Sequence, residues 1–181
     1  MKILGISGCE HAVPFKKRHF PGLDEREYRI SQGHDAAAAL IVDGVVVAAA
    51  AEERFDRKKH SAAFPLQAIR YSLREAGLSI GDIDEIAHSF DYRPFRRLFS
   101  MHPVTARLYD EVFSREALLA AVERDLPGFP ESKVHHVEHH LAHAASAWLT
   151  SGWDECLVAV IDAMGEVHPG AERATRDVRR H

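Results

Sequence analysis

Two apolar segments joined by Asp43-Gly44 constrain the fold of this chain more than any other feature of its sequence. Residues 36–42 and 45–51 are runs of small and β-branched residues with no charge. An Asp-Gly pair between two such runs favours a two-residue turn, because both central residues of that turn need positive φ. The pattern predicts a β-hairpin. Neither run alternates with polar residues, so we expect both faces of the sheet to be covered.

Further strands and helices are expected on both sides of this hairpin. Residues 3–7 are predicted to add a third antiparallel strand, and the polar residues 9–32 are predicted to form a long loop. Residues 91–103 are basic and aromatic, which predicts a surface excursion. The other expected strands are residues 84–90, 133–138 and 156–162, and the expected helices are residues 65–76, 104–113, 115–125 (with Ser114 as N-cap) and the histidine-rich segment after Glu138.

The order of these elements is typical of one α/β fold class. Three antiparallel strands followed by alternating helices and strands describe a ribonuclease-H-like half-domain with a mixed sheet, as in the actin, sugar-kinase and Hsp70 superfamily. Residues 1–166 would supply the first half and the first strand of a second half, so this domain is expected to be incomplete. Residues 167–181 show no apolar period and are predicted to be a disordered tail.

Composition excludes several classes of protein. Of the 181 residues, 46% are hydrophobic and 28% are charged, which is typical of a globular domain. A formal net charge of −4 provides no general attraction to nucleic acid or acidic membranes. Two cysteines are too few for a disulfide scaffold. No apolar run approaches the length of a membrane span, and the first residues do not read as a signal peptide, so we expect a cytoplasmic protein.

Histidine is the one compositional anomaly, with thirteen in the chain and five of them within residues 135–143. His139 and His143 are four positions apart, which on a helix places both imidazoles on one face and allows them to share a metal ion. This is not the zinc-protease signature, because His140 stands where that motif needs glutamate. Asp162, at the end of the apolar run 156–162, is the candidate third ligand. A solvated histidine-rich face is the alternative interpretation.

Four motifs together carry a family resemblance. Gly33-His34-Asp35 precedes AAAALIVDG, and EERFDRKKH, HHLAHAASA and IDAMGE follow in that order. In order and spacing they resemble the carbamoyltransferase family of nodulation-factor and antibiotic-tailoring enzymes, of which the chain would hold the N-terminal part only. The HxxxH helix is more distantly similar to that of the enzymes that transfer threonylcarbamoyl to tRNA.

The resemblance implies an activity and a set of site residues. It implies O-carbamoyl transfer from carbamoyl-adenylate to a hydroxyl of a small-molecule acceptor. His34 would be the general base, and Asp35 and Lys59 would line the substrate pocket. His139, His143 and Asp162 would bind a divalent metal. Imidazole and carboxylate suit both iron and zinc, and the resemblance favours iron.

The same resemblance implies partners and an alternative. Carbamoyl-adenylate would be made from ATP by a domain that this chain lacks, so the chain alone is expected to be inactive and to need the missing second half and adenylate-forming domain. A non-catalytic metal- or nucleotide-binding module is the alternative from another functional class. A sugar-kinase-like ATPase fragment is a third interpretation, disfavoured because the histidine pair has no role in it.

Overall fold

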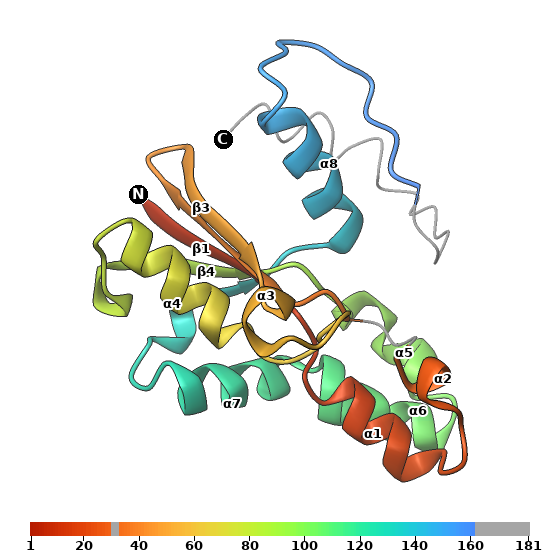
Figure 1. The fold of residues 1–181 in the computed structure, drawn as a ribbon. Helices are drawn as coiled ribbons and strands as arrows, with labels where there is room; N and C mark the ends of the chain where they lie inside the picture. Colours follow the sequence, from red (N-terminus) through yellow and green to blue (C-terminus); the bar gives the residue numbers. More distant parts are fainter. Residues whose placement is uncertain (30–32, 162–181) are drawn as a thin grey trace. The chain divides into compact units, whose positions relative to one another are not determined.

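The structure of the chain is a computed structural model that describes residues 1–29 and 33–161. The chain divides into two compact units, Met1–His136 and Val137–His181, and each is described by itself (Figure 1). The first unit is built on a five-stranded mixed sheet with helices, which confirms the predicted α/β class. In the part of the chain that is described, no helix has the length and apolar character to cross a membrane.

The elements follow the chain in a simple order. The strands are β1 (Lys2–Ser7), β2 (Ala37–Val42), β3 (Val45–Ala51), β4 (Glu85–His88) and β5 (Val134–His136). The helices of the first unit are α1 (Ala12–His19), α2 (Glu25–Arg29), α3 (Glu53–Asp56), α4 (Leu66–Glu75), α5 (Arg96–Phe99), α6 (Pro103–Leu108) and α7 (Arg115–Asp125). Short helical turns cover Ile80–Asp82, Arg93–Phe95, Tyr109–Phe113 and Glu131–Lys133. The second unit contains α8 (His139–Leu149).

The sheet has the strand order β3-β2-β1-β4-β5. The first three strands pair antiparallel, whereas β1 pairs parallel with β4 and β4 pairs parallel with β5. Ile6 lies beside His88, and His88 lies beside His136, so the carboxyl ends of the three parallel strands meet at one edge. The loops that follow β1 and β4 therefore start close together, at the edge where functional residues of parallel sheets commonly collect.

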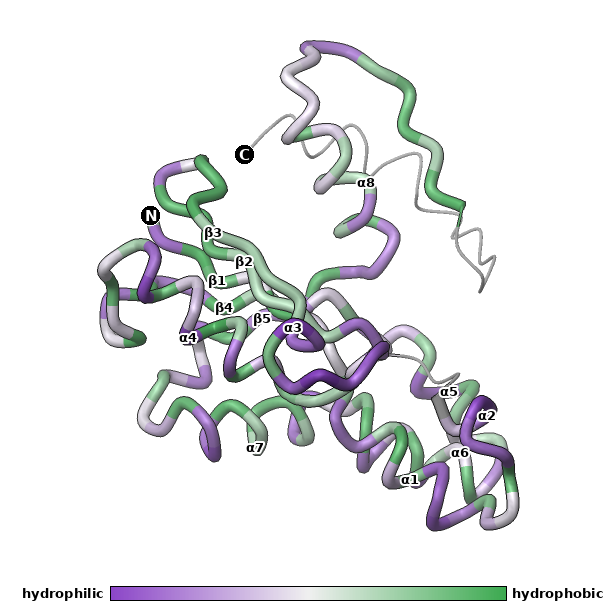
Figure 2. Tube along the Cα trace, viewed as in Figure 1, coloured by the Kyte–Doolittle hydropathy of each residue, from purple (hydrophilic) through white to green (hydrophobic). Residues whose placement is uncertain are grey.

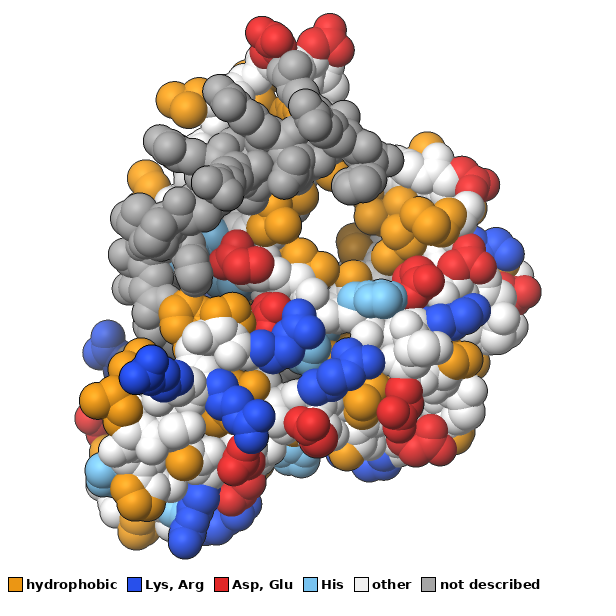
Figure 3. Space-filling model, turned by 180° about the vertical axis from the view of Figure 1, so that it is seen from behind, with side chains coloured by type: hydrophobic (Ala, Val, Ile, Leu, Met, Phe, Trp, Pro, Cys, Tyr) orange, Lys and Arg blue, Asp and Glu red, His pale blue; other side chains and the backbone are white. Residues whose placement is uncertain are grey.

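The predicted hairpin is confirmed. Val42 pairs with Val45, and the two residues between them, Asp43 and Gly44, have φ of 49° and 84°. Positive φ at both positions is what the two-residue turn requires. The strand after the turn begins with three exposed valines, Val45 to Val47, and the hydrophobic patch at this end of the hairpin is visible in Figure 3.

The main core lies against one face of the sheet. Leu4 and Ile6 of β1 are buried, and the residues that alternate with them are only half-buried. Helices α4 and α7 bring Ile69 and Val122 into the same cluster, on the side of the sheet where both helices are drawn in Figure 1. The other face of the sheet carries the half-buried residues, so within Met1–His136 the prediction that both faces would be covered is wrong. An uncharged strand does not need both faces buried, because its alternate side chains point to opposite faces of the sheet.

The predicted loop over residues 9–32 is also wrong, because this stretch contains α1 and α2. Phe15 in α1 is 2% exposed and packs in a second hydrophobic cluster with Tyr109 and Phe113. Tyr92 and Phe99 from residues 91–103 pack against the same cluster, so the predicted surface excursion contributes to it. Ala12 and Phe15 are apolar and three positions apart, a spacing that is typical of a helix. The basic residues that follow them obscured this pattern in the sequence.

The last predicted strand is not formed in residues 156–161. Figure 2 shows this stretch as a hydrophobic segment after α8, and it has neither helix nor strand. Leu157 and Ile161 are 97% and 94% exposed. An apolar run becomes a strand only when a neighbouring strand accepts its backbone hydrogen bonds, and within the described residues these positions pair with none. Asp162 and the predicted tail, residues 167–181, lie outside the described residues.

Candidate functional site

The loop after β1 and the loop before β2 are fastened to each other. The Cys9 backbone N–H donates to the Gly33 carbonyl at 2.9 Å. Gly33 has φ of +79°, and a Cβ placed there would lie 2.4 Å from the Cβ of Cys9. Only glycine fits so close an approach at positive φ. The Ser7 hydroxyl donates to the carbonyl of Asp35 at 3.2 Å, so residues 33–35 are fixed at the carboxyl end of β1.

The loop after α3 is fastened to the same place. The Ala36 backbone N–H donates to the Ser61 carbonyl at 2.7 Å. The Ser61 hydroxyl donates to the Asp56 carboxylate at 2.6 Å, and the His60 backbone N–H donates to the Glu53 carboxylate at 3.1 Å. These bonds fold residues 56–61 back over the start of β2, and they bring the side chain of His60 beside His34 and Asp35.

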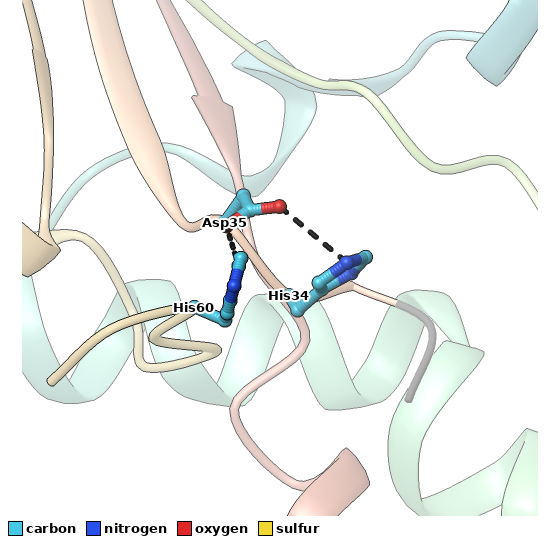
Figure 4. Close-up of side chains that lie close together, drawn as sticks. All are labelled: His34, Asp35 and His60. Carbon is cyan, nitrogen blue, oxygen red and sulfur yellow. Dashed lines mark hydrogen bonds and ion pairs between the residues drawn. The ribbon is translucent and has the colours of Figure 1, made fainter. Parts of the chain in front are cut away.

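Asp35 lies between two imidazoles (Figure 4). The Asp35 Oδ1 atom is 2.9 Å from His60 Nδ1, and its Oδ2 atom is 3.4 Å from His34 Nε2. The two ring centroids are 5.8 Å apart. All three side chains are about half exposed, at 46%, 56% and 47% for His34, Asp35 and His60. The cluster is thus open to solvent and can be reached by a ligand.

This cluster contains two of the four described non-glycine residues with positive φ, and the other two are Asp43 and Arg57. Asp35 and His60 have φ of 60° and 57°, in the left-handed region that residues other than glycine rarely adopt. Such conformations persist only where the surrounding structure enforces them, and they collect at functional sites. Here the enforcing contacts are the backbone hydrogen bonds of the two loops.

The sequence predicted two of the three members of this cluster. His34 and Asp35, which are adjacent in the sequence, were named as candidate site residues, whereas His60 was not singled out. The signal for His60 was its place as the last residue of EERFDRKKH, directly after the predicted Lys59. Lys59 is exposed, and among the described residues its side chain makes no ion pair with Asp35.

The predicted histidine pair lies on α8, in the second unit. The Glu138 carboxylate caps this helix by accepting from the backbone N–H groups of His140 and Leu141, at 3.0 and 2.6 Å. His139 Nε2 and His143 Nε2 are 3.2 Å apart, and their rings are inclined by 77°. Nitrogen atoms bound to one ion at about 2.1 Å stand roughly 3.0–3.4 Å apart, so the pair fits a shared metal ion.

A small cavity lies near the carboxyl ends of the parallel strands. Its volume is about 30 Å³, and it is lined by Cys9, His88, His136 and aromatic residues of the second cluster. Burial lowers the pKa of His88 from 6.5 to about 4 and also lowers the pKa of His136. Burial raises the pKa of the Cys9 thiol to about 12, so it stays protonated and is a poor nucleophile.

Comparison with known proteins relates part of the first unit to a family. Residues 28–98 match the model of the carbamoyltransferase N-terminus. The resemblance to the carbamoyltransferase family is confirmed. This matched carbamoyltransferase N-terminus contains His34, Asp35 and His60, so the whole cluster lies within it.

Individual relatives extend the similarity along the chain. Over 156 residues the chain is 38% identical to an uncharacterized protein of Synechocystis sp., covering 74% of this chain and 24% of that protein. Over 144 residues it is 37% identical to the nodulation protein NolNO of Sinorhizobium fredii, covering 76% of this chain and 20% of that protein. The chain therefore spans between a fifth and a quarter of the length of these two relatives.

Proposed function

We propose that this chain is the N-terminal part of an O-carbamoyltransferase, which passes a carbamoyl group from carbamoyl-adenylate to a hydroxyl of a small-molecule acceptor. The observation that carries the proposal is the match of residues 28–98 to the carbamoyltransferase N-terminus. That match encloses a histidine–carboxylate cluster whose side chains are about half exposed and whose backbone has positive φ at Asp35 and His60, which is an arrangement suited to moving a proton.

His34 is the proposed general base. A hydroxyl is a poor nucleophile until its proton is removed, and imidazole is the side chain whose pKa is nearest neutrality. The acceptor oxygen bonds to the carbamoyl carbon, the bond from that carbon to the phosphate oxygen breaks, and AMP leaves. The proton of the hydroxyl passes to His34, whose imidazolium is stabilised by the carboxylate of Asp35, 3.4 Å away.

Four further residues complete the proposal. Lys59 is the cation that offsets negative charge on the carbamoyl oxygen or the leaving phosphate. His139 and His143 would hold a divalent ion, for which we propose iron in preference to zinc, with Asp162 as a third ligand. Such an ion supplies Lewis-acid polarisation of bound oxygen atoms.

The topology supports a finer assignment of the fold. Three antiparallel strands at one side of the sheet and two parallel strands at the other, in the order β3-β2-β1-β4-β5, are what a ribonuclease-H-like half-domain requires. We therefore propose that fold for residues 1–136. A complete domain of this class would need a second half, and the adenylate donor would come from a further domain, so we expect no transfer from carbamoyl phosphate by this chain alone.

Release of AMP tests the proposal without knowledge of the acceptor. The chain is mixed with a partner chain that supplies the remaining part of a longer relative, with preformed carbamoyl-adenylate and with a panel of monosaccharides. AMP release and the carbamate product are measured by mass spectrometry. His34→Gln is expected to lower the rate roughly 100-fold or more, because proton transfer by a positioned base contributes that much. His11→Gln is the matched control, since His11 is also 46% exposed.

Two outcomes would contradict the proposal, one at the level of His34 and one at the level of the transferase activity. AMP release that is unchanged in His34→Gln overturns the role of this residue. Metal binding that depends on His143, without AMP release from any mixture, favours the non-catalytic module.

A further inference from the structure

The cluster of His34, Asp35 and His60 offers donor atoms as well as a proton path. One atom from each side chain can be chosen so that all three lie within 4.8 Å of one another. We propose that these three side chains form a second metal site, for a divalent transition-metal ion, separate from the histidine pair on α8. This inference goes beyond the proposed function, which assigns a metal only to α8 and Asp162.

The distances favour one shared ion. Ligand atoms at about 2.1 Å from a metal stand roughly 3.0–3.4 Å apart. The Asp35 carboxylate is already 2.9 Å from His60 Nδ1 and 3.4 Å from His34 Nε2, and Figure 4 shows both imidazoles directed toward that carboxylate. The ligand atoms of the three side chains lie within 4.8 Å of one another, so closing the site requires side-chain rotations that bring the two imidazole nitrogens nearer to each other. In the neutral tautomer of His60 that carries its proton on Nε2, the lone pair of Nδ1 is available to the ion.

The backbone around the cluster is preorganised to hold the ion. Asp35 and His60 are both in the left-handed region, and each is fixed to a neighbouring element: the Ser7 hydroxyl of β1 donates to the Asp35 carbonyl, and the His60 N–H donates to the Glu53 carboxylate of α3. Ligands held in place before binding lose little conformational entropy when the ion arrives. Residues from two separate loops thus converge without help from the metal.

The donor set selects the class of ion. Two imidazole nitrogens and one carboxylate suit Zn²⁺, Fe²⁺, Co²⁺ or Mn²⁺, whereas Mg²⁺ and Ca²⁺ prefer oxygen ligands alone. Three protein ligands leave coordination positions open on the exposed side, where all three side chains are about half exposed. An exogenous oxygen ligand can therefore reach the ion.

Occupation of this site has a consequence for His34. An ion bound at His34 Nε2 takes the lone pair of that nitrogen and leaves the ring proton on Nδ1, so neither ring nitrogen can accept the proton of the acceptor hydroxyl. Metal added beyond the needs of the α8 pair is therefore expected to inhibit a reaction in which His34 is the base. His60→Gln should relieve that inhibition.

Metal titration of the full chain tests the proposal. Zn²⁺ binding is measured by isothermal titration calorimetry, and Co²⁺ binding by its visible absorption. The wild type is expected to bind an ion that His139→Gln/His143→Gln still binds. Adding Asp35→Asn or His60→Gln to that double variant should weaken this ion roughly 100-fold, and adding His11→Gln should leave it unchanged. Far-UV circular dichroism confirms that each variant is folded.

Two results would overturn the second site. One is loss of all specific binding in His139→Gln/His143→Gln. The other is an ion that remains equally tight in folded Asp35→Asn and His60→Gln variants. Neither result depends on AMP release, so the second site and the transferase proposal can fail independently of each other.

Discussion

Two glutamates cap two helices in opposite settings. Glu52, at the end of β3, accepts from the backbone N–H groups of Gln67 and Ala68 at 3.2 and 2.8 Å, and so caps α4 from fifteen residues away. Glu138 immediately precedes α8 and caps it through its own neighbours. Glu52 is 4% exposed, whereas the side chain of Glu138 is 39% exposed.

The difference shows how the two histidine sites are supported. The cap on α4 exists only when the sheet is formed, and the His34–Asp35–His60 cluster depends on the same long-range contacts. The helix α8 has no buried residue, and its histidine spacing follows from helical geometry alone. Disruption of the sheet core should therefore abolish the cluster in the first unit more readily than the pair on α8.

The largest expected effect contrasts two leucines. Leu40 of β2 is fully buried, and Leu149 at the end of α8 is 64% exposed. Leu40→Ala is expected to lower the free energy of unfolding by about 2–5 kcal/mol, because it leaves a cavity in the core. Leu149→Ala should change it by less than about 0.5 kcal/mol. Urea denaturation measures both values, and equal losses would contradict the contrast drawn between the two units.

The next effect concerns pH and the buried His88. Its pKa is lowered from 6.5 to about 4 because burial disfavours the charged ring, and His136 beside it is lowered in the same direction. Between pH 6.5 and about pH 4 the His88 ring is therefore protonated in the unfolded chain and neutral in the native state. The free energy of unfolding falls as the pH is lowered through this range. The shift corresponds to at most about 3 kcal/mol.

Urea midpoints between pH 7 and pH 4 measure this loss. His88→Gln, which keeps a donor for the Gly8 carbonyl, should flatten the pH dependence. His102→Gln changes an exposed histidine and serves as the control. A wild-type slope retained in full by His88→Gln would assign the effect to other groups.

The smallest effect compares the two caps directly. Glu52→Ala leaves backbone N–H groups of α4 unpaired near the core and should cost about 1–3 kcal/mol. Glu138→Ala should lower the stability of α8 by about 1 kcal/mol or less, since water can replace an exposed cap. Hydrogen exchange of the amides of Ala68 and Leu141 reports each helix separately. Faster exchange at both sites in either single variant would mean that the two helices unfold together.

Local rules predicted those parts of the fold whose causes are local. Asp43-Gly44 specified its turn because the required φ values belong to those two residues. Ser114 was predicted as the N-cap of α7, and its hydroxyl does accept from the Ala117 N–H, at 3.1 Å. The His139–His143 geometry followed from one helical turn.

The remaining features depend on residues far apart in sequence. His60 joins His34 and Asp35 only because the loop after α3 folds back on the start of β2, which no local pattern encodes. The helix α1 was missed because its buried side depends on Tyr109 and Phe113, almost a hundred residues later. Residues 156–161 have strand-like composition, but composition alone does not supply a partner strand.

The parallel pairing of β1 with β4 also sets an order of assembly. The hairpin of β2 and β3 closes across two residues. In contrast, Ile3 of β1 pairs with Glu85 of β4, which lies far away in the sequence. Loops of that length close slowly, and β5 can dock only after β4 is in place. During synthesis the hairpin can therefore form early, while the sheet stays incomplete until the ribosome has released His136.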